Sequence, residues 1–126
     1  MDKLKQLNHS EWLVMEQLWQ APHSLMELVT LLEASAGWSK STVATMVRRM
    51  EEKGIIRHEE QGRTKIFYPC LSQAEVAQRE TQSLLERTYH GSIGLLVSTM
   101  AQRNALTKED IDELYDILKK AEEDVK

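Results

Sequence analysis

The chain has 126 residues, 41% of them hydrophobic and 29% charged, and its net charge at pH 7 is −4. This size fits one compact domain, or a small domain with an oligomerisation arm. No stretch approaches the roughly 20 apolar residues that a bilayer span requires, and the N-terminus lacks the apolar segment of a signal peptide. Cys70 is the single cysteine and cannot form an internal disulfide, which fits a reducing cytoplasm. We therefore expect a soluble cytoplasmic protein without membrane insertion.

Three amphipathic helices are predicted in the first part of the chain. Each predicted start has a side chain that can cap the helix N-terminus, and the first two also have a glutamate three residues later, which completes a capping box. The predicted helices begin at Asn8, Ser24 and Ser39, and they end at Pro22, Ala36-Gly37 and Gly54.

The pattern then changes to that of short strands. Residues 55–60 and 64–70 are predicted to form two strands around the turn Gln61-Gly62-Arg63. Three helices followed by a hairpin are the element order of a winged helix-turn-helix domain. We therefore expect a mainly α protein with a small β-hairpin, in which residues 1–71 form a winged helix-turn-helix domain.

Residues 72–126 are predicted to form a helical dimerisation arm, with helices over 73–89 and 93–102 and a last helix opened by residues 107–110. In the last helix, apolar residues recur alternately three and four positions apart, as in a helix–helix interface. This stripe can pack on helix 73–89 of the same chain or on a second chain. We expect a homodimer, because one chain offers little else to cover the arm. The predicted interface comprises Leu84, Leu85, Tyr89, Ile111, Leu114, Leu118 and Ala121.

The charge is distributed unevenly along the chain. Residues 39–65 carry seven basic and four acidic side chains, which gives +3. Residues 1–38 carry two basic and five acidic side chains, and residues 66–126 carry seven and eleven, which gives −3 and −4. A phosphate backbone is therefore attracted to residues 39–65 and repelled elsewhere.

The third predicted helix has a face suited to reading DNA. Its apolar stripe, Val43, Met46, Val47 and Met50, must face the core. Small hydroxyl residues on the outward side allow close approach to bases, and arginine can bind guanine or phosphate. Basic residues in the hairpin typically hold phosphate or the minor groove. A solvated surface helix is the alternative, although such a face more often carries glutamate and lysine. The predicted DNA-binding residues are Lys40, Ser41, Thr42, Thr45, Arg48, Arg49, Arg63 and Lys65.

Residues 38–56 resemble the recognition helix of the BlaI/MecI/CopY penicillinase-repressor family of winged-helix regulators. The similarity extends to residues 10–15, to the Phe67-Tyr68 strand and to residues 113–118. The resemblance implies a homodimer that binds a palindromic operator in double-stranded DNA and represses transcription. It places Lys40, Ser41, Thr42, Thr45 and Arg49 at the DNA-facing positions of the family. Ala44 departs from a pattern that often has arginine there, so the operator sequence cannot be carried over.

Two departures concern how repression is relieved. The copper-responsive branch has a C-terminal pair of Cys-x-Cys motifs, but residues 119–126 contain no cysteine, which excludes that thiolate site. The antibiotic-responsive branch, which this chain resembles more closely, is inactivated when a membrane sensor metalloprotease triggers proteolysis of the arm. Its usual Asn-Phe scissile pair is absent, and Ser98-Thr99-Met100 occupies the approximate position. The resemblance implies release in this way, in response to an antibiotic or cell-wall signal.

The sequence gives no indication of an enzyme, a cofactor or a metal site. His9, His23, His58 and His90 lack ligand spacing, and neither a glycine-rich phosphate loop nor a nucleophile elbow occurs. Two alternatives belong to other classes. One is a winged-helix protein–protein interaction module, which would not need the basic segment at 39–65. The other is a small-molecule-responsive regulator with a pocket between its domains.

Overall fold

The computed structural model describes residues 6–103 and 105–125, and the chain divides into two compact units, Met1–Thr81 and Gln82–Lys126. The division falls within helix α4, Gln73–Tyr89. The predicted domain boundary between residues 71 and 72 stays a prediction. No helix in the described residues is both long enough and apolar enough to cross a membrane.

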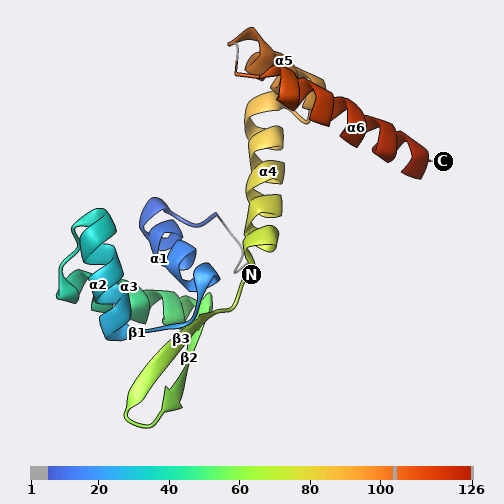
Figure 1. Cartoon of the computed structure of the whole chain (residues 1–126). Helices are drawn as coiled ribbons and strands as arrows, with labels where there is room; N and C mark the ends of the chain where they lie inside the picture. The colour runs from blue at the N-terminus through green and yellow to red at the C-terminus, as the bar shows by residue number, and fades with distance from the viewer. Residues whose placement is uncertain (1–5, 104, 126) are drawn as a thin grey trace. The chain divides into compact units, whose positions relative to one another are not determined.

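The first unit begins with three helices (Figure 1). Asn8, Ser24 and Ser39 are their N-caps, as predicted, and the first two capping boxes are complete in both directions. The second and third helices end at Gly37 and Gly54, whose φ values of 71° and 82° are readily adopted only by glycine. The helices are α1, His9–Gln20; α2, Leu25–Ala36; and α3, Lys40–Lys53.

A three-stranded antiparallel sheet completes this unit, in the order β1-β3-β2. The predicted hairpin is confirmed as β2, Ile56–Gln61, and β3, Thr64–Pro69, which lie within one residue of the expected bounds. Gly62 in the turn has a φ of 67°. Strand β1, His23–Ser24, was not predicted, because two residues directly before a helix show no strand period. It pairs with β3 at His23–Phe67 and Ser24–Ile66, and so fixes the start of α2 against the hairpin.

One hydrophobic core lies between the three helices and the sheet. Its residues come from every element of the first unit except β1, and Phe67 of β3 is 4% exposed. The indole N–H of Trp19 donates to the Leu71 carbonyl at 2.8 Å, and Trp12 lies edge-on to Trp19 with ring centroids 5.4 Å apart. The core residues are Val14, Met15, Leu18, Leu28, Leu32, Val43, Val47, Met50, Ile55, Ile56, Phe67, Leu71 and Val76.

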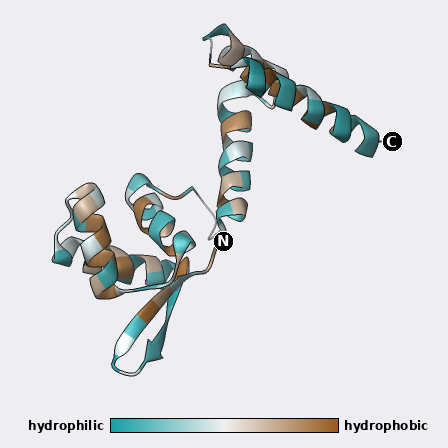
Figure 2. Ribbon diagram, in the orientation of Figure 1, coloured by the Kyte–Doolittle hydropathy of each residue, from teal (hydrophilic) through white to brown (hydrophobic). Residues whose placement is uncertain are grey.

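The second unit contains the end of α4 together with α5, Ile93–Gln102, and α6, Lys108–Asp124. Capping boxes are formed at Ser72–Glu75 and at Thr107–Asp110, where the last helix was predicted to open. No described residue of this unit is buried. Figure 2 shows hydrophobic residues between the hydrophilic turns of α6. Apolar side chains of this arm are therefore open to a partner.

Candidate nucleic-acid interface

Helix α3 separates its apolar and polar residues between two faces. Val43, Val47 and Met50 are buried and Met46 is half-buried, which confirms the predicted core stripe. On the outward side, the predicted DNA-binding residues of α3 are exposed apart from Thr45, which is half-buried. The helix thus presents a continuous polar surface that is supported from behind by the core.

Hydroxyl groups surround the N-terminus of α3. The Ser39 side chain accepts a hydrogen bond from the backbone N–H of Thr42 at 3.2 Å, and its hydroxyl lies 3.0 Å from the Thr42 hydroxyl and 3.2 Å from that of Ser41. This network caps the helix without a carboxylate. The positive end of the helix dipole therefore remains available to an anion such as phosphate.

The structure separates two arginines that are adjacent in the sequence. Arg49 lines a shallow depression of about 230 Å³ together with Ser41, Thr42, Thr45 and Met46. Arg48 lies at a different groove, beside the hairpin, and forms an exposed ion pair with Glu52 at 3.6 Å. Sequence reasoning grouped Arg48 and Arg49 on one face, since a helical period alone does not reveal which neighbouring element each contacts.

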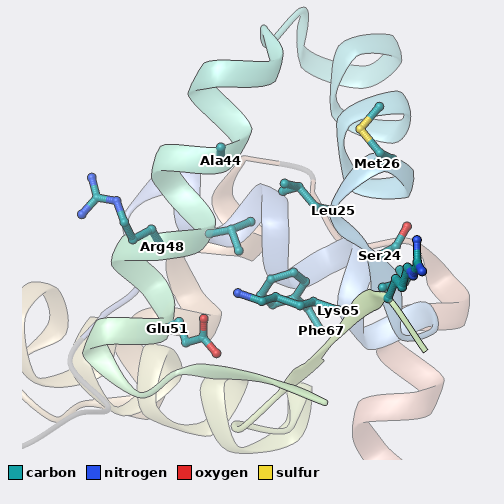
Figure 3. Close-up of a pocket in the computed structure, with 11 residues that line it drawn as sticks. Ser24, Leu25, Met26, Ala44, Arg48, Glu51, Lys65 and Phe67 are labelled. Atoms are coloured by element: carbon teal, nitrogen blue, oxygen red, sulfur yellow. The ribbon is translucent and has the colours of Figure 1, made fainter. Parts of the chain in front are cut away.

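The groove beside the hairpin lies between α3, the start of α2 and β3, and has a volume of about 700 Å³ (Figure 3). Arg63 and Lys65 reach it from the hairpin, and both are exposed. Neither forms an ion pair with any residue in 6–103 or 105–125. The structure thus brings Arg48, Arg63 and Lys65 to one groove, while Arg49 lies at the other.

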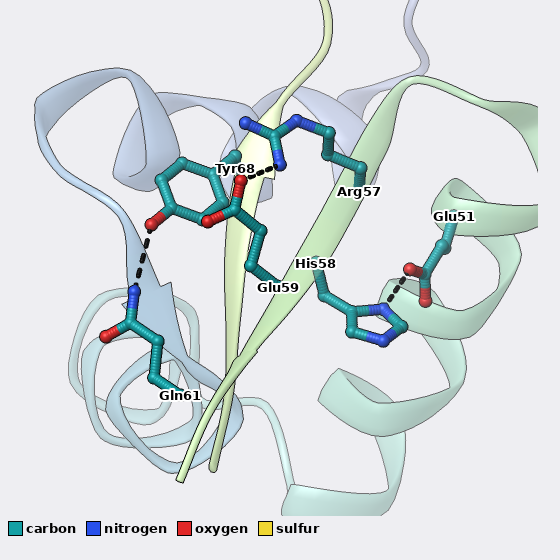
Figure 4. A network of polar contacts seen from close by, with 6 residues as sticks. All are labelled: Glu51, Arg57, His58, Glu59, Gln61 and Tyr68. Atoms are coloured by element: carbon teal, nitrogen blue, oxygen red, sulfur yellow. Dashed lines mark hydrogen bonds and ion pairs between the residues drawn. The ribbon is translucent and has the colours of Figure 1, made fainter.

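Polar contacts join the hairpin to α3 and its two strands to each other (Figure 4). His58 of β2 pairs through Nδ1 with the Glu51 carboxylate of α3, and its ring lies 5.7 Å from that of Phe67. On β2, Arg57 pairs with Glu59 at 2.6 Å and lies 4.5 Å from the centre of the Tyr68 ring. In the sequence, His58 shows only that it lacks metal-ligand spacing. A histidine in a strand has no spacing signal that points to a helix seven residues earlier.

The C-terminal end of α3 is held from the other side. Lys53 pairs with the carboxylate of Glu11, whose side chain is only 6% exposed. The same carboxylate accepts the backbone N–H of Asn8 at 3.0 Å. Sequence reasoning assigned Glu11 to the capping box but missed its pairing with Lys53, 42 residues later in the chain. Helix α3, which was predicted to bind DNA, is thus attached to α1 through Lys53 and to β2 through Glu51.

A basic, solvent-facing third helix that is followed by a basic hairpin defines the class of winged-helix DNA-binding proteins. No cluster of three or more potential metal-ligating side chains occurs in the described parts of the chain. The chain matches the family described as "Penicillinase repressor" over residues 7–120, and it belongs to that family. Its members are DNA-binding transcriptional repressors rather than enzymes, as the sequence predicted.

Individual relatives agree with this assignment. The penicillinase repressor of Bacillus licheniformis is 31% identical over 121 residues, which cover 94% of this chain and 93% of the relative. The methicillin resistance regulatory protein MecI of Staphylococcus aureus (strain N315) is 22% identical over 120 residues, or 94% and 98% of the two chains. The solution structure of the DNA binding domain of the repressor BlaI is 28% identical and superposes with a TM-score of 0.53, covering 60% of this chain and 93% of that one. The predicted winged-helix fold is thereby confirmed.

Proposed function

We propose that this protein is a cytoplasmic homodimeric repressor that binds a palindromic operator, with α3 in the major groove and the hairpin on the adjacent backbone. The observation that carries the proposal is the surface formed by α3 and the hairpin. This surface contains the capped N-terminus of α3, with Lys40 and several hydroxyl side chains. It also contains four further basic residues that are exposed. These four are Arg48, Arg49, Arg63 and Lys65.

The two grooves support a division of roles among these residues. Ser41, Thr42, Thr45 and Arg49 share the depression on the outer face of α3, so we assign them to base edges. Lys40 lies at the helix start, and Arg48, Arg63 and Lys65 surround the groove beside the hairpin. A backbone passing between a major-groove helix and a wing meets this second group, so we assign it to phosphates.

The dimer is proposed from the unpartnered apolar surface of the arm. Leu118 and Ile111 of the predicted seam are 61% and 42% exposed, and Leu84 is 39% exposed. Side chains of this size are seldom left open together in a protein that works as a monomer. A second copy of the chain supplies the same seam, so both stripes are covered in a symmetric contact. The remaining predicted interface residues are Leu85, Tyr89, Leu114 and Ala121, on α4 and α6.

We further propose that repression ends when the arm is cut by proteolysis, under the control of a membrane sensor metalloprotease. The support is the similarity to a penicillinase repressor and to a methicillin resistance regulatory protein over most of both chains. Residues 98–100 lie in α5, where the Thr99 hydroxyl donates to the Leu95 carbonyl at 2.9 Å. Cleavage at this position requires local opening of the helix, since a protease binds its substrate in an extended form.

The test begins with selection of binding sites from random double-stranded DNA by the full-length chain. We expect one enriched palindrome, tight binding to it, and affinity that falls steeply with salt concentration. A single half-site should bind much more weakly than the palindrome. Failure to enrich any sequence would overturn the repressor proposal. Affinity for mixed DNA that does not change with salt would instead favour the protein–protein interaction module.

A further inference from the structure

The groove beside the hairpin has the dimensions of a small-molecule site. Its volume of about 700 Å³ falls within the usual range of roughly 300–1,000 Å³. All its lining residues belong to α2, α3, β1 and the hairpin, so the groove lies entirely within the first unit. It differs in this respect from the pocket between domains that a small-molecule regulator was expected to have.

The floor of the groove is apolar. Leu25, Ala44, Val47 and Phe67 line it, with Val47 and Phe67 each 4% exposed. Met26 lies at the same groove with 54% of its surface exposed, although a methionine is normally covered. Methionine side chains adapt their shape to irregular apolar partners. An apolar body placed on this floor would chiefly cover Met26, since Val47 and Phe67 are already buried.

The rim is cationic. Arg48, Arg63 and Lys65 line the groove, and in Figure 3 Lys65 points towards α3. Glu51 is the only acidic lining residue, and its carboxylate is already paired with His58. Arg48 forms an exposed ion pair with Glu52 at 3.6 Å, and such a pair contributes little and can be exchanged for a bound anion. Arg63 and Lys65 have no carboxylate partner among the residues that the structure places. The rim therefore favours an anionic group, and an arginine favours one with the planar oxygens of a carboxylate.

We propose that this groove binds a small amphipathic carboxylate, with its apolar body on the Val47–Phe67 floor and its carboxylate at Arg48, Arg63 and Lys65. The inference rests on the proposed function in one respect. Because the same three cations are assigned to DNA phosphates, the bound carboxylate and the operator exclude each other. Ala44 makes the site accessible, since its methyl side chain lines the groove and a larger side chain there would fill the space.

The experiment titrates the isotope-labelled full-length chain with 2-naphthoate in the absence of DNA, followed by backbone amide NMR. We expect saturable shifts confined to the groove and at least about tenfold weaker binding of the neutral 2-naphthamide. Ala44→Leu should abolish binding of both compounds, because it fills the floor. Arg48→Gln should weaken binding of the acid alone by about tenfold.

Arg49→Gln is the matched control for Arg48→Gln. It removes the same charge from the adjacent position but lies at the other depression, so the 2-naphthoate affinity should be unchanged. Equal affinity for acid and amide, equal effects of the two arginine variants, or shifts outside the groove would each overturn the inference. If Ala44→Leu disturbs the fold, the arginine pair and the acid–amide comparison still decide.

Competition for the selected palindrome then separates the two proposals. We expect 2-naphthoate, but not acetate at the same concentration, to displace the chain from DNA. If the chain binds DNA but 2-naphthoate does not displace it, the inference is wrong and the repressor proposal stands. If 2-naphthoate binds but no DNA is bound in its absence, the proposed function is wrong, and so is the regulatory part of the inference.

Discussion

Lys53, the last residue of α3, forms an ion pair with Glu11, in the first turn of α1. The carboxylate of Glu11 is buried and serves two donors, since it also accepts the backbone N–H of Asn8. A buried carboxylate that loses a partner is costly, whereas an exposed ion pair contributes little. Glu11 therefore links the start of α1 to the end of α3.

The first prediction concerns this link. Glu11→Gln keeps an acceptor for the backbone N–H of Asn8 but loses the charge that pairs with Lys53. We therefore expect the free energy of unfolding to fall by about 1–2 kcal/mol. The measurement is urea denaturation of the full-length chain. Glu16→Gln, on the exposed side of the same helix, is the control and should change stability by less than about 0.5 kcal/mol. Equal losses in the two variants would contradict the assigned role of Glu11.

The second prediction concerns the hairpin. His58→Gln removes the pairing with Glu51 and the ring contact with Phe67, so the hairpin is held less firmly against α3. We expect affinity for specific and random DNA to fall by a similar factor, on the order of three- to tenfold, because backbone contacts are affected rather than base contacts. Fluorescence anisotropy measures both. Glu60→Gln, exposed on the same strand, should not weaken either. Loss of specific binding alone would contradict the prediction.

The third prediction distinguishes base contacts from phosphate contacts. Arg49→Gln should lower specific affinity by about 1–3 kcal/mol and relax the sequence preference, while random DNA is bound nearly as before. Arg63→Gln should weaken binding to all sequences and reduce the slope of log K against log salt by about 1. Binding isotherms at several salt concentrations provide both quantities. Identical behaviour of the two variants would refute the division of roles between the grooves.

The fourth prediction concerns pH. The backbone N–H of Ser24 donates to Glu27, and His23 lies 3.6 Å away, so the pKa of Glu27 is lowered below its ordinary value of 4.5. A carboxylate with a lowered pKa in the folded state stabilises the protein above its unfolded pKa, and this contribution is lost as the pH falls through the folded pKa. The stability difference between the native chain and Glu27→Gln should therefore shrink as the pH falls below about 4.5. A difference that stays constant down to pH 3 would contradict this.

The fifth prediction concerns the arm. Leu118→Gln combined with Leu114→Gln places two amides in the predicted seam, so the proposed dimer should dissociate at concentrations where the native chain is dimeric. Sedimentation velocity measures the change. The control is Glu122→Gln. Glu122 is on the same helix but is not one of the seam residues, so this variant should leave the dimer intact. A double variant that stays dimeric would show that the seam lies elsewhere.

Local signals in the sequence predicted most of the elements. Capping residues such as Asn8 and Thr107 lie at helix starts because their side chains bond N–H groups within the next turn, and Gly54 ends a helix through its own positive φ. Contacts between distant segments were not predicted. The Glu51–His58 pair and strand β1 depend on how the hairpin lies against α2 and α3, which no local pattern encodes.

The same limit applies to the candidate interface. The helical period placed Arg48 and Arg49 together on the outward side of α3. It could not assign them to different grooves, because one of those grooves is made partly by the hairpin. The apolar floor that Leu25 and Phe67 share was likewise beyond prediction, since the two residues are 42 positions apart and each matches an ordinary core pattern.

The tryptophans have a practical consequence for spectroscopy. Trp12 lies edge-on to Trp19, which is bonded to Leu71, so both are part of the packed first unit. The chain has three tryptophans, at positions 12, 19 and 38, and all belong to the first unit. Tryptophan emission therefore reports on the first unit alone, whereas far-ultraviolet dichroism reports on the helices of both. If the two optical signals change together on heating, the units melt as one; if they change separately, each has its own transition. The chain thus allows its first unit to be followed by itself, and compared with the whole chain, without any added label.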